Sequence, residues 1–293
     1  MPDCALPISA NADDLLWDAR LTLGFADDGG TTRLVERRHF GPLRVQKPLY
    51  PEGPAVCHAI VVHPPGGIVG GDGLSITAGV GPGARAFLTS PGAAKWYKAN
   101  GKVSRQRVLL SAAAGASVEW LPQESIFFDR AAVRTEHQVM LAGDASYLGC
   151  EIVCLGRRAS GETFSSGSIG QRTEIRRDGK LLWWEQGLLD AAAGKLRSAM
   201  GMAGRTVCAT LLAAPGGPQP AATLLAALRA TCGALAAAEA GALCGATQMK
   251  QLIVVRYLGH DSEVARRVML AAWQQLRPAM LGLAAPVPRI WNT

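Results

Sequence analysis

Several side chains in this sequence could bind a metal ion, but they do not follow a known ligand spacing. The candidates are His63, Asp72, His137, the Cys57-His58 pair, Cys150 and Cys154. No CxxC pair occurs among the seven cysteines, and no HExxH motif is present. The sequence therefore gives no sign of a zinc ribbon, a thioredoxin-like redox motif or a zinc metalloprotease.

Cys150 and Cys154 would face the same side of a strand, four residues apart. Their separation of roughly 13 Å along a strand is too large for one ion to bridge directly. The favoured interpretation is two buried, apolar thiols. His63 precedes two prolines, and a structural histidine is preferred there over a metal ligand.

Two enzymatic interpretations were tested against the residues. The glycine-rich residues 66–73 lack the P-loop pattern, because Asp72 stands where a phosphate-binding lysine is required. GxGxxG and GxSxG are absent as well. Glu119, Glu124 and Asp129 could pair as acid and base in a β-solenoid carbohydrate enzyme. Aromatic residues make up only 6% of the chain, which is low for a sugar site, so this stays an alternative.

The composition predicts a folded protein with a basic surface. Apolar residues make up 48% of the 293 residues, and the net charge is +7. The arginines occur as scattered pairs without a long run of like charge, so a solvated surface is preferred over a nucleic-acid-binding arm. The first seven residues do not resemble a signal peptide, and no apolar run is long enough for a transmembrane helix. We expect a cytoplasmic protein without membrane or nucleic-acid partners.

Alternation of polar and apolar residues dominates from about residue 17 to residue 190 and predicts β-strands. Small-residue turns precede several of these strands. Gly83, Gly115 and Gly143 recur at a spacing near 30 residues, which suggests strands stacked in layers. Asp178-Gly179 between two apolar runs predicts a β-hairpin. The expected fold is therefore mainly β, with a β-solenoid-like body.

The C-terminal part predicts about two helices. Leu224, Leu228, Cys232 and Leu235 recur at helical spacing after a loop rich in glycine and proline. A strand over residues 252–258 follows. A second helix should then begin with Asp261 or Ser262 as its N-cap, and Pro278 should end or kink it.

Six segments, read in order, resemble one family. Residues 63–72 read HPPGGIVGGD, residues 89–97 TSPGAAKWY, and residues 119–124 EWLPQE. LGR at 155–157, GETF at 161–164 and PRIWNT at 288–293 complete the series. In this order and over residues 17 to 293, they are similar to the UreD (UreH) urease accessory proteins. We therefore expect a single UreD-like domain over residues 1–293.

The resemblance implies a non-catalytic metallochaperone scaffold for urease maturation. A UreD-like protein is expected to act with UreF and the GTPase UreG on apo-urease, and to let nickel ions pass transiently through its interior. GTP hydrolysis would then belong to UreG. This expectation agrees with the lack of a nucleotide loop and of a recognisable catalytic set in this sequence.

A nickel passage needs ligands that bind weakly enough to release the ion. Asp72, at the end of the glycine-rich loop, is the first candidate, with an Asx cap as the alternative role. Glu185, after an apolar run, is the second, with an arginine partner as the alternative. His63 and Cys154 are weaker candidates. For UreF, the helix over 264–276 and the tail over 286–293 are candidate contacts, unless both pack within the chain.

Overall fold

The computed structural model describes residues 17–194, 196–218 and 222–292. Strands account for 48% of it, and two α-helices occur in the C-terminal part of the described chain. This confirms the predicted fold class, a mainly β body with a few late helices. The predicted domain limits of 1 and 293, the N-terminal segment compared with a signal peptide, and Cys4 lie outside the described residues.

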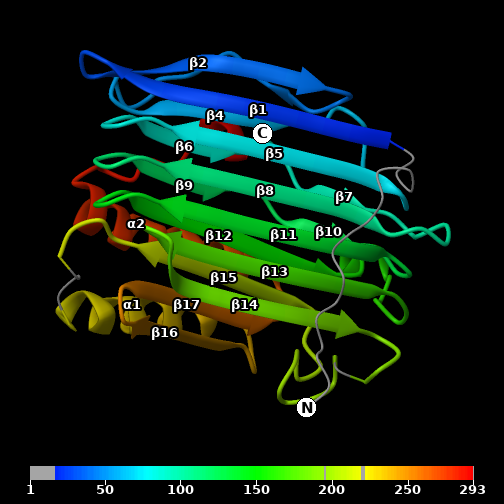
Figure 1. Ribbon diagram of the computed structural model, residues 1–293. Helices are drawn as coiled ribbons and strands as arrows, with labels where there is room; N and C mark the ends of the chain where they lie inside the picture. The colour runs from blue at the N-terminus through cyan, green and yellow to red at the C-terminus, as the bar shows by residue number, and fades with distance from the viewer. Residues whose placement is uncertain (1–16, 195, 219–221, 293) are drawn as a thin grey trace.

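Two large sheets form the body (Figure 1). The first has seven strands in the order β14-β13-β11-β8-β5-β1-β2. Its strands are β1 (Trp17–Asp28), β2 (Thr31–Phe40), β5 (Asp72–Val80), β8 (Ser104–Ala112), β11 (Ala132–Leu141), β13 (Ser168–Arg177) and β14 (Lys180–Asp190).

The second sheet has the order β16-β17-β15-β12-β9-β6-β4-β3, and the short strand β10 pairs with β12 on one side and with the short strand β7 on the other. Its strands are β3 (Arg44–Val45), β4 (Cys57–Val62), β6 (Arg85–Thr89), β7 (Ala94–Trp96), β9 (Ser117–Leu121), β10 (Ser125–Phe127), β12 (Ser146–Leu155), β15 (Val207–Ala214), β16 (Leu243–Met249) and β17 (Leu252–Gly259).

Consecutive strands alternate between the sheets, which produces the stacked layers. β5 leads into β6, β8 into β9 and β11 into β12, and each strand pairs in parallel with its counterpart in the next layer. The turns between the sheets lie above one another. The Asp144 carboxylate accepts a hydrogen bond from the Gly115 N–H, and Asp178 accepts one from the Gly143 N–H. The predicted repeat near 30 residues is therefore one layer of this stack.

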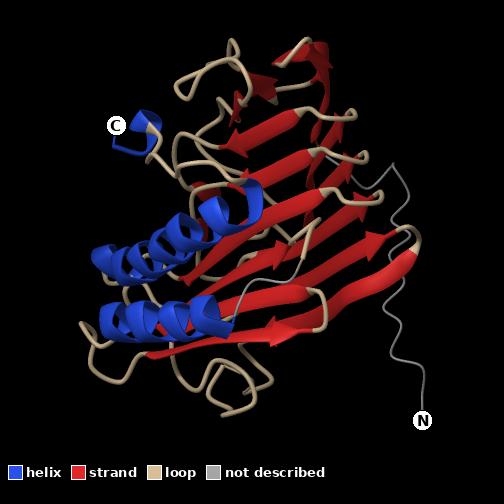
Figure 2. Ribbon diagram, turned by 90° about the vertical axis from the view of Figure 1, so that its left-hand side faces the viewer, coloured by secondary structure: helices blue, strands red, loops and turns tan. Residues whose placement is uncertain are grey.

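Two apolar cores hold the molecule together. Inward-facing residues of both sheets form the first core, such as Leu23 and Ile76 of the first sheet and Ala86 and Val118 of the second. The second lies between the outer face of the second sheet and the helices, and Leu211 and Val255 belong to it. Figure 2 shows both helices on this one side of the strands. Period-2 alternation thus sends each strand's side chains into two different environments.

The helices match their predicted positions. In α1 (Ala222–Ala236), Leu228 and Cys232 of the predicted apolar stripe are buried, and Leu224 and Leu235 are partly buried against the same core. α2 (Ser262–Leu281) begins after the N-cap Asp261, whose carboxylate accepts from the Glu263 and Val264 N–H groups. Helical residues continue past Pro278 to Leu281, and the Gly282 N–H then donates to the Pro278 carbonyl. Proline here removes one hydrogen bond without ending the helix.

Three smaller features complete the fold. The predicted hairpin joins β13 and β14 through Asp178 and Gly179. Short 3-10 helices cover Arg158–Ser160 and Arg289–Asn292. Neither described α-helix combines the length and apolar character needed to cross a bilayer.

Candidate functional site: a polar cavity between the sheets

A cavity of about 470 Å³ lies between the two sheets. Its lining comes from β5, β8, β11, β13 and β14 on one side and from β4, β9, β12, β15 and β17 on the other. The His63–Gly67 loop and the loop after β6 also line it. The space is unusual for the interior of a β body because many of its lining groups are polar, among them Gln106, His137, Glu151 and Thr210.

Glu151 is the most perturbed carboxylate of this cavity. It lies on β12 between Cys150 and Ile152, and strand alternation directs it to the opposite side from these two apolar neighbours. Burial raises the pKa of the Glu151 carboxyl to about 7, although a hydrogen bond with Gln171 of β13 opposes the shift. Near neutral pH this group therefore exchanges a proton easily, and it prefers a nearby cation when ionised.

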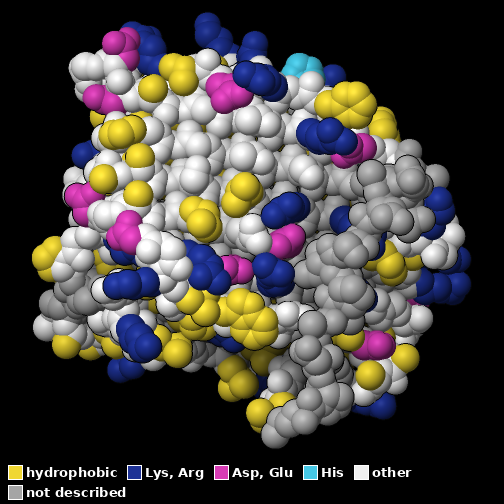
Figure 3. Space-filling view, viewed as in Figure 1, with side chains coloured by type: hydrophobic (Ala, Val, Ile, Leu, Met, Phe, Trp, Pro, Cys, Tyr) yellow, Lys and Arg dark blue, Asp and Glu magenta, His cyan; other side chains and the backbone are white. Residues whose placement is uncertain are grey.

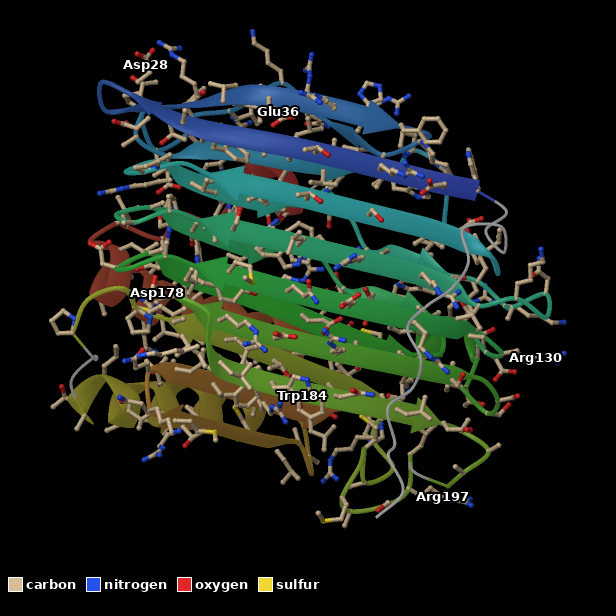
Figure 4. All side chains as sticks on the ribbon, viewed as in Figure 1. Asp28, Glu36, Arg130, Asp178, Trp184 and Arg197 are labelled. Atoms are coloured by element: carbon tan, nitrogen blue, oxygen red, sulfur yellow. The ribbon has the colours of Figure 1, made fainter. Side chains whose placement is uncertain are left out.

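Glu185 lines the same cavity from β14 and is paired with an arginine. Arg256 of β17 donates to both Glu185 oxygens at 2.5 Å, so the ion pair links the edge strand β14 of the first sheet to β17 of the second sheet. The side chains are 41% and 46% exposed, and the guanidinium also lies 5.9 Å from the Trp183 ring centroid. The alternative proposed for Glu185, an arginine partner, is thus present. The preceding residue, Trp184, points outward and is 54% exposed (Figure 4).

Cys208 and His137 add further polar character to the cavity. The Cys208 thiol on β15 interacts electrostatically with Arg256, Glu151 and Glu185, and burial raises its pKa to about 11. Burial lowers the pKa of His137 to about 4, which keeps the imidazole neutral. Its Nε2 lies 2.8 Å from the Tyr147 hydroxyl. Both groups could therefore accept a cation only at the cost of local rearrangement or proton loss.

His63 and Asp72 lie near one another but have different surroundings. His63 lines the cavity, and burial lowers the pKa of its imidazole while the Asp72 charge opposes this shift. Asp72 is only 4% exposed. Its carboxylate accepts from the Val69 N–H at 3.0 Å, and its own N–H donates to the Val69 carbonyl. The geometry matches the alternative of an Asx cap for Asp72, without testing whether it also meets an ion.

The glycines of the HPPGGIVGGD segment have a packing role. A Cβ at Gly67 would lie 2.4 Å from the Tyr97 ring, and one at Gly70 would lie 2.3 Å from the Asn100 amide oxygen. Tyr97 also donates a hydrogen bond to the Gly66 carbonyl. The loop therefore needs glycine because the segment after β7 packs directly against it.

Cys154 faces the other side of the second sheet. It belongs to the core beneath the helices, together with Cys150, and burial raises its pKa to about 12. The shared face predicted for these two cysteines is therefore observed. Three of the four candidate nickel ligands, His63, Asp72 and Glu185, lie at or beside the cavity, whereas Cys154 does not line it.

The three carboxylates of the enzyme alternative all have structural partners. Glu119 accepts from Trp273 Nε1 at 2.7 Å and from Arg277 Nε at 2.9 Å in a fully buried setting. Glu124 is ion-paired with Arg266 of α2. Asp129 accepts backbone N–H donors at residues 165 and 166. None of these contacts favours an acid–base pair facing a substrate.

Sequence reasoning missed Glu151, Cys208 and Arg256 as cavity residues. For Glu151 a usable signal existed, because alternation around two buried cysteines places it on the inner face. Arg256 offered a similar signal within the apolar strand β17. Within the described residues, no group of three or more His, Cys, Asp or Glu side chains could hold a metal ion.

The fold and the cavity define a class of protein: a stacked two-sheet body with polar side chains in an interior cavity and helices on one outer face. Comparison with known proteins identifies the family within this class. The family model described as UreD urease accessory protein matches residues 18–292. The chain therefore belongs to the UreD urease accessory protein family.

Relatives cover nearly the whole chain. The urease accessory protein UreD of Janthinobacterium sp. (strain Marseille) is 61% identical over 275 residues, which is 94% of this chain and 91% of that protein. That of Nitrosospira multiformis is 51% identical and covers 96% of this chain and 100% of that protein. That of Dechloromonas aromatica is 49% identical, with 98% and 99% covered. The family resemblance read from the six sequence segments is thus confirmed.

Proposed function

We propose that this chain serves urease maturation as a non-catalytic scaffold, and that Ni²⁺ passes through the cavity between its sheets on the way to apo-urease. Membership of the urease accessory protein family supports the role in maturation. The observation that carries the route is the presence of ionisable side chains along a cavity in an otherwise apolar interior, with Glu151, Glu185 and His63 as the candidate ligands.

The chemistry of the lining suits transit better than storage. Ni²⁺ accepts oxygen, nitrogen and sulfur ligands, and a conducting route needs several weak sites rather than one closed cage. Glu151 and Glu185 belong to opposite sheets, and Glu151 shares a proton equilibrium with the solvent near neutral pH. An arriving Ni²⁺ ion would displace that proton from Glu151. Return of the proton to Glu151 would then help to release the metal ion.

Arg256 has a specific place in this proposal. Its guanidinium neutralises Glu185 when no ion is present, so a metal ion can use Glu185 only by displacing it. Because the pair is about half exposed, displacement costs little compared with a buried pair. Arg256 would then hold the edge of the cavity together between passages.

The other three candidate ligands differ in how closely they are associated with the cavity. His63 is a neutral ligand that lines the cavity. Asp72 acts on the loop beside it, through its cap on Val69, and contributes negative charge. Cys154 remains a proposed ligand, although a route touching it would have to leave the cavity for the helix side of the second sheet.

We also propose cytoplasmic assembly with UreF, with the GTPase UreG and with apo-urease. The apolar side of α2 is packed against its own sheet, and Trp291 of the tail donates to Thr89. Packing within the chain, the alternative considered for both segments, therefore applies to their apolar groups. Contact with UreF at α2 would have to use its exposed polar side, which includes Glu263, Arg267 and Gln274.

Urease activation in cells lacking this gene tests the proposal. The gene is restored as wild type, Asp72→Ala, Glu185→Ala or Glu151→Gln, and urease activity and nickel content are measured. We expect Glu151→Gln and Glu185→Ala to reduce both, because each removes a carboxylate from the cavity. Asp72→Ala should reduce them as well, through the loop that carries His63.

Glu174→Ala is the matched control, because Glu174 lies on the cavity strand β13 but does not line the cavity, and it pairs with Arg172 and Arg176 instead. It should restore activity fully. Full nickel loading by all three cavity variants, at wild-type protein levels, would show that the site assignment is wrong.

A further inference from the structure

Two cysteines lie together far from the cavity, on the helix side of the second sheet. Cys232 belongs to the buried face of α1 and is 1% exposed. Cys244 belongs to β16, the edge strand of the second sheet, and is partly buried against the same core. Their thiols interact with each other where α1 packs on β16, and the Cys232 Sγ also lies 3.9 Å from the Val268 carbonyl oxygen. Both are free in this structure.

The surroundings give the two thiols different reactivity. The interaction with the Cys232 thiol lowers the pKa of the Cys244 thiol, and the Gly245 N–H lowers it further, whereas burial opposes the shift. For Cys232, both the interaction with Cys244 and burial raise the pKa. Because the thiolate is the reactive form, the partly buried Cys244 is the better nucleophile. The buried Cys232 is the second thiol, which can react with Cys244 once Cys244 is oxidised.

The two cysteines of β12 show the opposite combination. Cys150 and Cys154 are both buried, and burial raises the pKa of each thiol. They also occupy positions four residues apart on one strand, which is too far for an S–S bond. Cys57 and Cys208 lie on the non-adjacent strands β4 and β15, and burial raises the pKa of each thiol. Among the described cysteines, only the α1–β16 pair therefore combines contact, partial exposure and an activated thiol.

We propose that Cys232 and Cys244 form a reversible intramolecular disulfide when the protein meets a peroxide. The Cys244 thiolate attacks one peroxide oxygen, which breaks the O–O bond, gives a sulfenic acid and releases hydroxide that takes up a proton. The Cys232 sulfur then attacks the Cys244 sulfur, and the sulfenic oxygen leaves as water with the Cys232 proton. Two thiols and one hydrogen peroxide thus give one disulfide and two water molecules.

The bond would join α1 covalently to an edge strand. β16 pairs with β17 alone, so its attachment to the body depends on one hydrogen-bonded ladder and on the packing of α1. A disulfide would restrict opening of this edge in the oxidised state. In a reducing compartment the pair would return to two thiols.

The sequence offers a direct assay. The tryptic peptide from Ala230 to Lys250 contains Cys232 and Cys244 and no other cysteine, and Glu239 lies between them. The full chain is treated with hydrogen peroxide, alkylated, digested with trypsin and analysed by mass spectrometry. We expect this peptide to lose two hydrogens, to take up no alkyl group, and to stay linked after further cleavage at Glu239. Dithiothreitol should reverse all three changes.

Two variants make the test specific. Cys244→Ser, at a half-exposed position, should leave Cys232 alkylated after peroxide, whereas Cys154→Ser should leave disulfide formation intact. Wild-type protein whose 230–250 peptide stays fully alkylated under peroxide, or is oxidised at Cys244 only to sulfinic acid, would overturn the proposal. So would a disulfide that links either cysteine to a different one.

Discussion

Arg277 is the centre of a buried charge network, and replacing it with methionine should destabilise the protein strongly. The side chain is 0% exposed. It donates to Glu119 at 2.9 Å and to Glu52 at 2.9 Å, and it also contacts the Ala284 carbonyl. His58 lies 2.7 Å from the same Glu52 carboxylate. The network joins α2, β4, β9 and the chain after α2.

The size of the destabilisation follows from the two buried carboxylates, Glu119 and Glu52, that lose their arginine partner. Burial already raises the pKa of Glu119 against the charge of Arg277. For Glu52, burial acts in the same direction, but hydrogen bonds from His58 and Arg277 outweigh it and lower the pKa. Removing one partner of a buried ion pair typically costs about 3–5 kcal/mol. For a chain of this size, that corresponds to a fall in Tm on the order of 10 °C.

Thermal and urea unfolding of the purified chain would measure this loss, with Arg157→Met as the control. Arg157 is paired with Glu162 at the surface, so its replacement should leave the midpoint unchanged within error. The Arg277→Met deficit should shrink at about pH 5, because protonation of Glu119 and Glu52 removes the unpaired charge. Equal midpoints for the two variants, or a deficit independent of pH, would refute this reasoning.

Three further predictions concern the cavity, the loop and α2. Glu151 keeps its proton to about pH 7 when folded, against an ordinary value of 4.5, so the unfolded chain releases it first and stability falls as pH rises between these values. Glu151→Gln should therefore gain stability relative to wild type over this range, by on the order of 1–3 kcal/mol in urea unfolding. Gly67→Ala should lower Tm and expose the 63–72 loop to faster hydrogen exchange, since its Cβ meets Tyr97; unchanged exchange would contradict this. Asp261→Ala should lower the free energy of unfolding by about 1 kcal/mol through loss of the N-cap. Asp261→Asn should retain most of the stability that the N-cap contributes, because Asn is also a good N-cap residue.

Local signals in the sequence predicted much of the fold. Period-2 alternation, the glycine turns near 83, 115 and 143, and the Asp178-Gly179 hairpin each act over a few residues, and each was confirmed. The helical spacing of apolar residues in α1 and the N-cap Asp261 of α2 are also signals that act within a few residues. What alternation alone could not supply was the arrangement of the layers as two sheets with ten and seven strands.

The candidate site was harder to predict from the sequence, because its contacts join distant parts of the chain. Glu185 and Arg256 are 71 residues apart in sequence, and Thr89 and Trp291 are 202 apart. No local pattern states which arginine a carboxylate will meet. The surface of the first sheet illustrates the difficulty, since basic and acidic side chains lie side by side across it (Figure 3). A sequence shows these charges but not which of them turn inward.

The nickel content of urease matured with a plugged cavity tests the central claim most directly. Thr210 lines the cavity from β15, whereas Thr77 on β5 does not line it. Cells that lack the gene would express Thr210→Phe or, as the control, Thr77→Phe, and urease would be purified for metal analysis. We predict that Thr210→Phe, folded and still bound to its partners, yields nickel-poor urease while Thr77→Phe yields fully loaded enzyme. Fully loaded urease from a folded Thr210→Phe protein would contradict passage through this cavity.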